Sequence, residues 1–143
     1  MSEFQRRHSA FLVADIEAAK AAFTVTAGTP FGEIMSVPTR VESESSSIDL
    51  EITFAHALDG ATELIQVSAE PGPFAPEVGL GFHHIGGIGP VDLAEEIERQ
   101  EASGSLVESR LFLGEDQMFA VFFAPIERRP VRLEVMAPFM SDY

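Results

Sequence analysis

The chain has 143 residues, of which 45% are hydrophobic and 22% charged, a composition typical of one globular domain and not of a disordered segment. Nine Lys and Arg residues against 23 Asp and Glu residues give a formal net charge of −14. Such a chain lacks the basic surface that binds nucleic acid or anionic membranes. It has no cysteine, which excludes disulfides, zinc–thiolate sites and thiol catalysis.

No apolar run approaches the ~20 residues that a membrane-spanning helix needs. The first eight residues are mostly polar, and no signal-like apolar stretch with a cleavage site follows them. We therefore expect a cytoplasmic protein with no membrane partner.

Residues 8–28 are typical of a strand followed by a helix. His8 opens an apolar stretch, and Asp15 is a good N-cap residue. Apolar side chains at helical spacing then predict a helix over 16–27. Gly28 stands where a left-handed residue ends many helices.

The same order of residues returns in the second half of the chain: His84, Asp92, a helix over 93–103 and Gly104. This weak repeat divides the chain into units of about 6–70 and 80–138. A connector rich in Pro and Gly, 70–79, joins them.

β-branched and aromatic residues are frequent after each helix. They predict strands over 48–56, 63–67, 119–124 and 131–136. The segments 33–47 and 111–117 are expected to be loops that shape the substrate pocket.

Alternation along two of these strands predicts which side chains share a face. In 48–56, the apolar residues Ile48, Leu50, Ile52 and Phe54 should pack on a helix, which turns Glu51 toward the opposite, concave face. In 131–136, Arg132 and Glu134 likewise lie opposite the apolar residues. Carboxylates on a concave face, with His near the strand starts, could bind a hard cation. The same face could instead meet solvent, as in many antiparallel sheets.

Four segments, HSAFLVADIEAA, TELIQV, GFHHIGGIGPVDLAEEI and VRLEVMAP, resemble the vicinal oxygen chelate superfamily over about residues 6–138. The likeness is nearest the glyoxalase-like branch that also contains methylmalonyl-CoA epimerase. It implies an α+β fold in which two βαβββ units form a cupped mixed sheet, a half-barrel, with helices on its outer face. The chain would be a single domain over 1–143. Exposed sheet edges and the small size also favour a homodimer.

The resemblance further implies a metal site. In that branch, one His and one Glu or Gln from each unit hold the ion, and the matching positions are His8, Glu63, His84 and Glu134. Two imidazoles and two carboxylates suit one divalent ion of Co, Ni, Mn, Fe or Zn, with two positions left for water or substrate. The sequence leaves the identity of the metal open.

Two other histidines are assigned supporting roles. His83 is expected to point to the face opposite His84, where it would have a structural or supporting role. His56 shares a face with Ile52 and Phe54 near a strand end and is expected to be a partly exposed structural residue.

Glu51 resembles the catalytic carboxylate of the epimerases and could be the general base, although a solvent-facing Glu is an equal alternative. Glu63 or Glu134, displaced from the metal, could also move the proton. Arg132 could bind a carboxylate or phosphate of the substrate, or could pair with a carboxylate of the chain itself.

The implied function is that of a divalent-metal-dependent isomerase, epimerase or lyase. It would transfer a proton α to a carbonyl of a small substrate or of its thiol or CoA adduct. The alternative is a metal-free protein that binds small molecules, of the drug-sequestering type. An Fe(II) dioxygenase is a weaker third hypothesis. Competent ligands at all four positions favour the enzyme.

Overall fold

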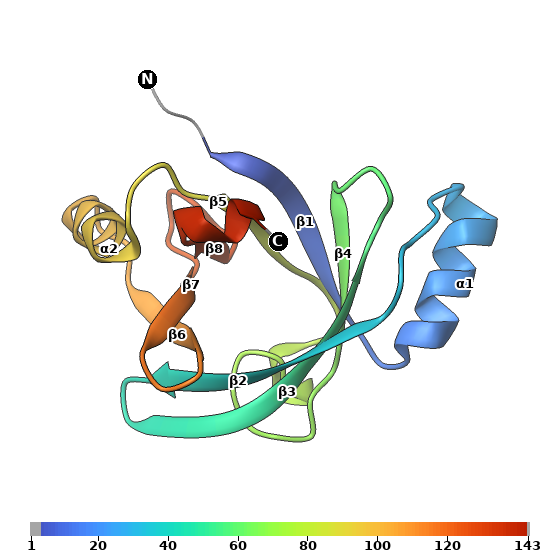
Figure 1. Cartoon of the computed structure of the whole chain (residues 1–143), viewed down its shortest axis with the longest axis horizontal. Coiled ribbons are helices and arrows are strands. Elements are labelled where there is room, and N and C mark those ends of the chain that lie inside the picture. The colour runs from blue at the N-terminus through green and yellow to red at the C-terminus, as the bar shows by residue number, and fades with distance from the viewer. Residues whose placement is uncertain (1–3, 143) are drawn as a thin grey trace.

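The computed structural model describes residues 4–142, which form one strongly curved sheet with two helices on its outside (Figure 1). The first unit consists of β1 (Gln5–Val13), α1 (Ile16–Ala27), β2 (Met35–Ser43), β3 (Ser46–His56) and β4 (Thr62–Gln66). The second unit consists of β5 (Gly81–Ile88), α2 (Leu93–Ala102), β6 (Val107–Leu113), β7 (Gln117–Phe123) and β8 (Leu133–Met136). Two short 3-10 helices complete the fold: η1 (Pro76–Val78) in the connector and η2 (Pro138–Asp142) after β8.

The order of the strands confirms the predicted pair of βαβββ units. The strands follow one another as β1-β4-β3-β2-β6-β7-β8-β5, and β5 returns to β1. In each unit the first strand pairs in parallel with the last, β1 with β4 and β5 with β8. Antiparallel pairing of β1 with β5 and of β2 with β6 joins the units. The α+β fold is therefore as expected. The sheet closes into a barrel, whereas the expected sheet was a half-barrel.

Two segments that were predicted as loops are largely strands. Residues 33–47 contain β2, and residues 111–117 contain the end of β6 and the turn into β7. In β2, the buried side chains of Thr39 and Val41 alternate with Pro38 and Arg40, which is the period of a half-buried strand. The signal was missed because few of these residues are strongly apolar.

Both helices begin as the sequence predicts, and α1 also ends as predicted, whereas α2 ends at Ala102 with Ser103, and not Gly104, as its C-cap. The Asp15 carboxylate accepts a hydrogen bond from the backbone N–H of Ala18, and Asp92 does the same for the N–H of Glu95. Gly28 has a φ of 63°, the left-handed conformation in which Gly is favoured after a helix.

The helices cover two patches of the outer face of the barrel. Ile16 of α1 packs with Ala55 and Leu64. Leu93 of α2 packs with Val121 and Val135 in a second cluster. None of the helices in residues 4–142 is long and apolar enough to span a membrane.

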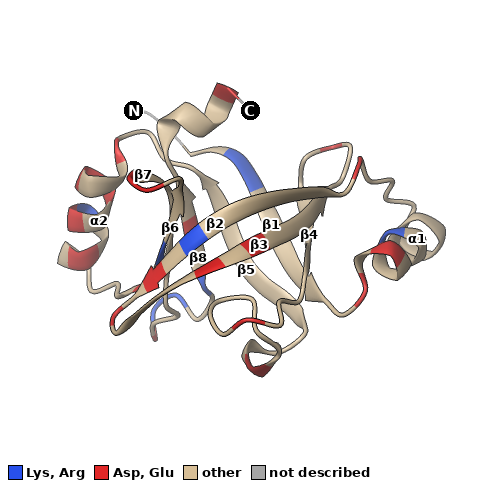
Figure 2. Cartoon of the chain, turned by 60° about the horizontal axis from the view of Figure 1, so that its bottom comes forward, with Lys and Arg blue, Asp and Glu red and all other residues tan. Residues whose placement is uncertain are grey.

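The face assignment for β3 is wrong. Its apolar residues Ile48, Leu50, Ile52 and Phe54 join the cluster inside the barrel, and do not pack on a helix. A closed barrel has an interior that side chains must fill, which requires an apolar inner face on β3. Glu51 is exposed on the outer face. Acidic residues are also spread over α1, α2 and the loops, so Glu51 is one of many on the surface (Figure 2).

Closure also removes one argument for a dimer. Every strand of the barrel has a hydrogen-bonded neighbour on both sides, so the described sheet has no free edge. Pairing of exposed edges therefore cannot join two copies, and a dimer would have to form through side-chain surfaces.

Replacement of Leu64 by Ala should destabilise the fold by about 2–5 kcal/mol, because Leu64 is fully buried under α1 and its truncation leaves a cavity. Chemical denaturation would measure the loss. Leu58→Ala is the control, since Leu58 is 71% exposed and its truncation should change stability by less than about 0.5 kcal/mol. Equal losses in the two variants would contradict the packing of α1 on β4.

Candidate metal centre

Four side chains converge inside the barrel from four neighbouring strands. They are the four predicted metal ligands: His8 on β1, Glu63 on β4, His84 on β5 and Glu134 on β8. The pairing of the strands places these residues at about the same height in the barrel. Gly86 lies opposite both His8 and Glu134. Ala10 lies opposite both Glu63 and His84. The repeat thus supplies one His and one Glu from each unit.

The distances within this cluster are short. The Nε2 atoms of His8 and His84 are 3.3 Å apart. Glu134 Oε1 lies 3.4 Å from each of these nitrogens, and Glu63 Oε1 lies 3.8 Å from each. Atoms that bind one ion at 2.0–2.2 Å lie about 3–4 Å from one another, so the cluster has the dimensions of a ligand set.

The backbone before His8 orients its imidazole. His8 Nδ1 lies 3.1 Å from the carbonyl oxygen of Arg6 and can donate its proton there, which leaves Nε2 to face the cluster. Arg6 has a φ of 50°, the single positive value that a non-Gly residue takes in residues 4–142. Its guanidinium donates to the carbonyl oxygens of Met140 and Ser141, so η2 is tied to the same segment.

A chain of hydrogen bonds from the connector orients His84. His83 Nε2 lies 2.6 Å from the carbonyl oxygen of Pro73, which can only accept, so this nitrogen carries the proton. His83 Nδ1 is then the acceptor for His84 Nδ1–H, at 2.7 Å. His84 Nε2 then faces the cluster. Burial, followed by the charge of His84, lowers the pKa of His83 to about 4, in agreement with a neutral His83.

The prediction that His83 points away from His84 is wrong because β5 contains a bulge. His84 lies opposite Ala10, whereas Phe82 lies opposite Phe11, which leaves His83 as the extra residue. Both imidazoles are buried, and both contact the ring of Phe122. The bulge therefore places His83 where it can hold His84.

The carboxylates of the cluster stabilise a positive charge on His8. Burial lowers the pKa of His8, but the hydrogen bond to Glu134 and the charges of Glu134 and Glu63 outweigh it and raise the pKa to about 9. For Glu134, burial alone would raise the pKa. The nearby His84 charge and the hydrogen bonds from both histidines hold it far below its usual range.

Glu63 differs from Glu134 because its second oxygen is held from outside the cluster. Its Oε2 lies 2.7 Å from Nε2 of His56, which stands directly opposite Glu63 on β3. The His56 side chain is 55% exposed, whereas that of Glu63 is 14% exposed. His56 is therefore linked to the cluster, beyond the structural role that its strand position predicts.

Gly86 makes room for the cluster. A Cβ atom at this position would lie 2.8 Å from Cε1 of His8 and 3.0 Å from Oε1 of Glu134, which is closer than side-chain atoms approach one another. Sequence reasoning missed this role, although two consecutive glycines in a buried strand do indicate a close approach of other atoms.

The structure brings neither Glu51 nor Arg132 into the cluster. Glu51 is exposed on the outside of β3, so the expectation that it faces the site is wrong. Arg132 precedes β8 and pairs with Glu108, with Nε 2.6 Å from Oε1, and it donates to the carbonyl oxygen of His83 at 3.0 Å. Of the two roles left open for Arg132, the structure contains the pairing with a carboxylate of the chain.

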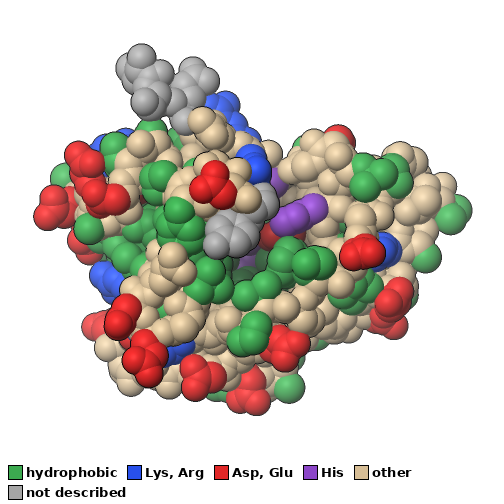
Figure 3. Space-filling model, in the orientation of Figure 1, with side chains coloured by type: hydrophobic (Ala, Val, Ile, Leu, Met, Phe, Trp, Pro, Cys, Tyr) green, Lys and Arg blue, Asp and Glu red, His purple; other side chains and the backbone are tan. Residues whose placement is uncertain are grey.

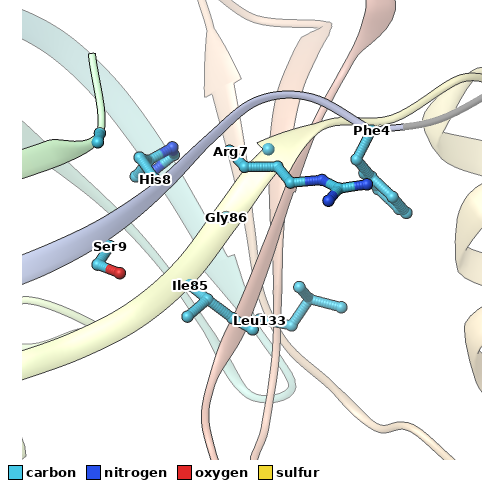
Figure 4. A pocket seen from close by; sticks show the side chains of 9 residues that line it. Phe4, Arg7, His8, Ser9, Ile85, Gly86 and Leu133 are labelled. Carbon is cyan, nitrogen blue, oxygen red and sulfur yellow. The ribbon is translucent and has the colours of Figure 1, made fainter. Parts of the chain in front are cut away.

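Histidine side chains are visible in a hollow of the surface, next to hydrophobic side chains (Figure 3). A cavity of about 500 Å³ lies over β1 and β5, with Phe4, Ile85 and Leu133 in its lining. His8 and Ser9 lie on opposite sides of β1 there (Figure 4). His8 thus belongs both to the lining of this outer cavity and to the cluster inside the barrel.

No protein-family profile matches the sequence, and no curated protein matches it. Several solved structures are similar. The hypothetical protein BH1468 from Bacillus halodurans superposes with a TM-score of 0.64 and 16% identity, over 94% of this chain and 93% of the other. Methylmalonyl-CoA epimerase from Mycobacterium tuberculosis gives 0.58 and 13%, over 100% and 97%.

A single-residue variant of the Streptomyces coelicolor methylmalonyl-CoA epimerase, in complex with 2-nitronate-propionyl-CoA, gives a TM-score of 0.57 and 16% identity, over 94% of this chain and 98% of the other. At these identities the likeness concerns the fold. The chain has the fold of the vicinal oxygen chelate superfamily.

Proposed function

We propose that the protein is a divalent-metal-dependent isomerase or epimerase that moves a proton α to a carbonyl group of a small substrate. The observation that carries this proposal is the convergence of His8, Glu63, His84 and Glu134, in which the two His Nε2 atoms lie 3.3 Å apart and each lies 3.4–3.8 Å from one oxygen of each Glu. A lyase acting on a thiol adduct would use the same proton transfer.

The residues of the cluster fit a divalent ion. Two carboxylates offset its charge, and each imidazole is held through Nδ1 so that Nε2 faces the centre. The absence of a side chain at Gly86 leaves the space that the cluster needs. Mixed nitrogen and oxygen ligands are compatible with Co, Ni, Mn, Fe or Zn.

An ion held there would polarise the carbonyl oxygen of the substrate and acidify the neighbouring C–H group. The proton then needs a base. We assign this role to Glu63, which is farther from the imidazoles than Glu134 and adjoins the exposed His56. When Glu63 Oε1 is displaced from the ion it can accept the proton. The C–H bond then breaks, an O–H bond forms at Oε1, and the electron pair moves onto the carbonyl oxygen as an enolate. Return of the proton to a neighbouring atom on the same face gives an isomer, and protonation of the opposite face of the carbon by a water molecule gives the epimer.

The similar structures support this chemistry at the level of the fold. Two of them are methylmalonyl-CoA epimerases, and a third is such an enzyme in complex with methylmalonyl-CoA and NH4+. Acyl-CoA thioesters with a substituent at C2 are therefore one class of substrate to test, and adducts of 2-oxoaldehydes with thiols are the other.

The protein purified without a His tag, or incubated with Co, Ni, Mn or Zn and then desalted, should contain about one metal ion per chain. His84→Ala should lose most of it, because the substitution removes a ligand and leaves His83 without its partner. Elemental analysis measures both. Wild-type protein without metal would contradict the proposal and favour the metal-free binding protein.

The reaction itself is tested by solvent exchange. Wild-type enzyme with bound metal should incorporate deuterium from D2O at the carbon α to the carbonyl, and Glu63→Gln should not, because an amide cannot accept the proton. Mass spectrometry of the two substrate classes measures the uptake. Equal uptake by Glu63→Gln would contradict the assignment of the base.

Gly86→Ala should weaken the binding of metal, because the added methyl group would displace the imidazole of His8 or the carboxylate of Glu134. We expect a loss of at least about tenfold in affinity, the scale of changes seen when the support of a ligand is disturbed. Gly32→Ala is the matched control, since a Cβ atom there would have its nearest contact at an ordinary 3.7 Å. Unchanged affinity in Gly86→Ala would argue that the cluster is not the ligand set.

We also propose that the protein is a homodimer that forms through the outer face around β5. Leu80, Phe82 and Ile85 are 59%, 47% and 38% exposed there, and a group of exposed large apolar side chains in one segment is typical of an interface. Light scattering should give the mass of two chains, and Phe82→Glu should reduce it toward one. A wild-type mass of one chain would contradict the dimer.

A further inference from the structure

His56 stands in a position that the proposed chemistry does not yet use. It is the last residue of β3 and lies directly across from Glu63 on β4. Its Nε2 is 2.7 Å from Glu63 Oε2, while Glu63 Oε1 faces the two cluster histidines at 3.8 Å. The carboxylate is thus held at one oxygen from the rim and presents the other to the centre.

The imidazole of His56 is itself supported. The ring of Phe54 lies 5.2 Å from it, centroid to centroid, at an angle of 48°. Phe54 belongs to the packed interior of the barrel, which restricts where the His56 ring can turn. An exposed side chain usually gains little from one hydrogen bond, because it must give up rotamer freedom to form it. The contact with Phe54 reduces that cost.

The other members of the cluster are held differently. His8 and His84 are fixed through Nδ1, by the Arg6 carbonyl oxygen and by His83. Glu134 is buried, and one of its oxygens lies 3.4 Å from both cluster imidazoles. Glu63 is less buried and more distant, so without His56 its carboxylate could rotate and offer both oxygens, or neither, to the centre.

We propose that His56 is a positioning residue that fixes Glu63 as a ligand through one oxygen only. This inference rests on the proposed metal site. A carboxylate that binds through one oxygen occupies one coordination position, and the position that a second oxygen would take stays open for the substrate. His56 acts through Glu63 and touches neither the ion nor the reacting carbon in this arrangement.

The test compares His56→Ala, His56→Gln and wild type in titrations of the metal-free protein with Ni²⁺ and Co²⁺. His56→Ala should weaken binding about tenfold, as is typical when the hydrogen-bond partner of a ligand is removed. His56→Gln, whose amide N–H can donate to the same oxygen, should restore most of the affinity. The visible spectrum of bound Co²⁺ should change in His56→Ala and return toward wild type in His56→Gln, because the number of coordinating oxygens changes.

The control is Glu51→Gln, on the outer face of the same strand, which should match wild type in affinity and spectrum. Thermal unfolding of all variants separates loss of fold from loss of the site. If wild type binds metal while His56→Ala keeps both the affinity and the spectrum, or if His56→Gln is as impaired as His56→Ala, the positioning role is overturned and the metal site stands. If wild type binds neither ion, the proposed function fails, and this inference fails with it.

Discussion

The placement of two carboxylates and two imidazoles inside one barrel is the constraint on which the rest of the structure depends. Charges are costly to bury, and they are retained only where opposite charges or hydrogen bonds compensate them. Here the two Glu side chains raise the pKa of His8 to about 9 and are offset by the histidines in return. A divalent ion would satisfy the same negative charge with the imidazoles neutral. The cluster is therefore a site that must hold either protons or a metal, and the exchange of one for the other links metal binding to pH.

The features of the fold that follow local chemistry could be read from the sequence. The Asp residues at the helix starts, the glycine after α1 and the alternation in β8 each act over a few residues, and the internal repeat supplies the Asp N-cap twice. Closure of the barrel depends instead on the pairing of β2 with β6, which lie about 70 residues apart and have weak strand signals. Without knowledge of that closure, the apolar face of β3 is naturally assigned to a helix, and Glu51 is then turned inward by the same alternation. One long-range contact thus accounts for both errors.

The predicted ligands come together because each unit of the repeat pairs its first strand, which carries the His, with its last strand, which carries the Glu. The residues that hold them were harder to see. His83 reaches His84 only because a single extra residue in β5 changes the alternation of side chains, and such a bulge has no clear sequence signal. His56 reaches Glu63 because the two residues lie opposite each other in the pairing of β3 with β4. That register depends on the geometry of the turn between the strands, which the sequence alone does not give. Gly86 is informative in retrospect, since the side chain it lacks is the space that His8 and Glu134 occupy.

The two halves of the repeat give the two carboxylates unequal surroundings, and this inequality has a chemical consequence. Glu134 shares one oxygen with both imidazoles inside the barrel, so its charge is committed to them. Glu63 lies farther from both and is held at its other oxygen by a residue on the surface. A symmetric pair of ligands would hold an ion equally well, but neither carboxylate would be free to accept a proton. The departure from symmetry at Glu63, which the neighbouring strand supplies through His56, is what would let a metal-binding fold carry out proton transfer.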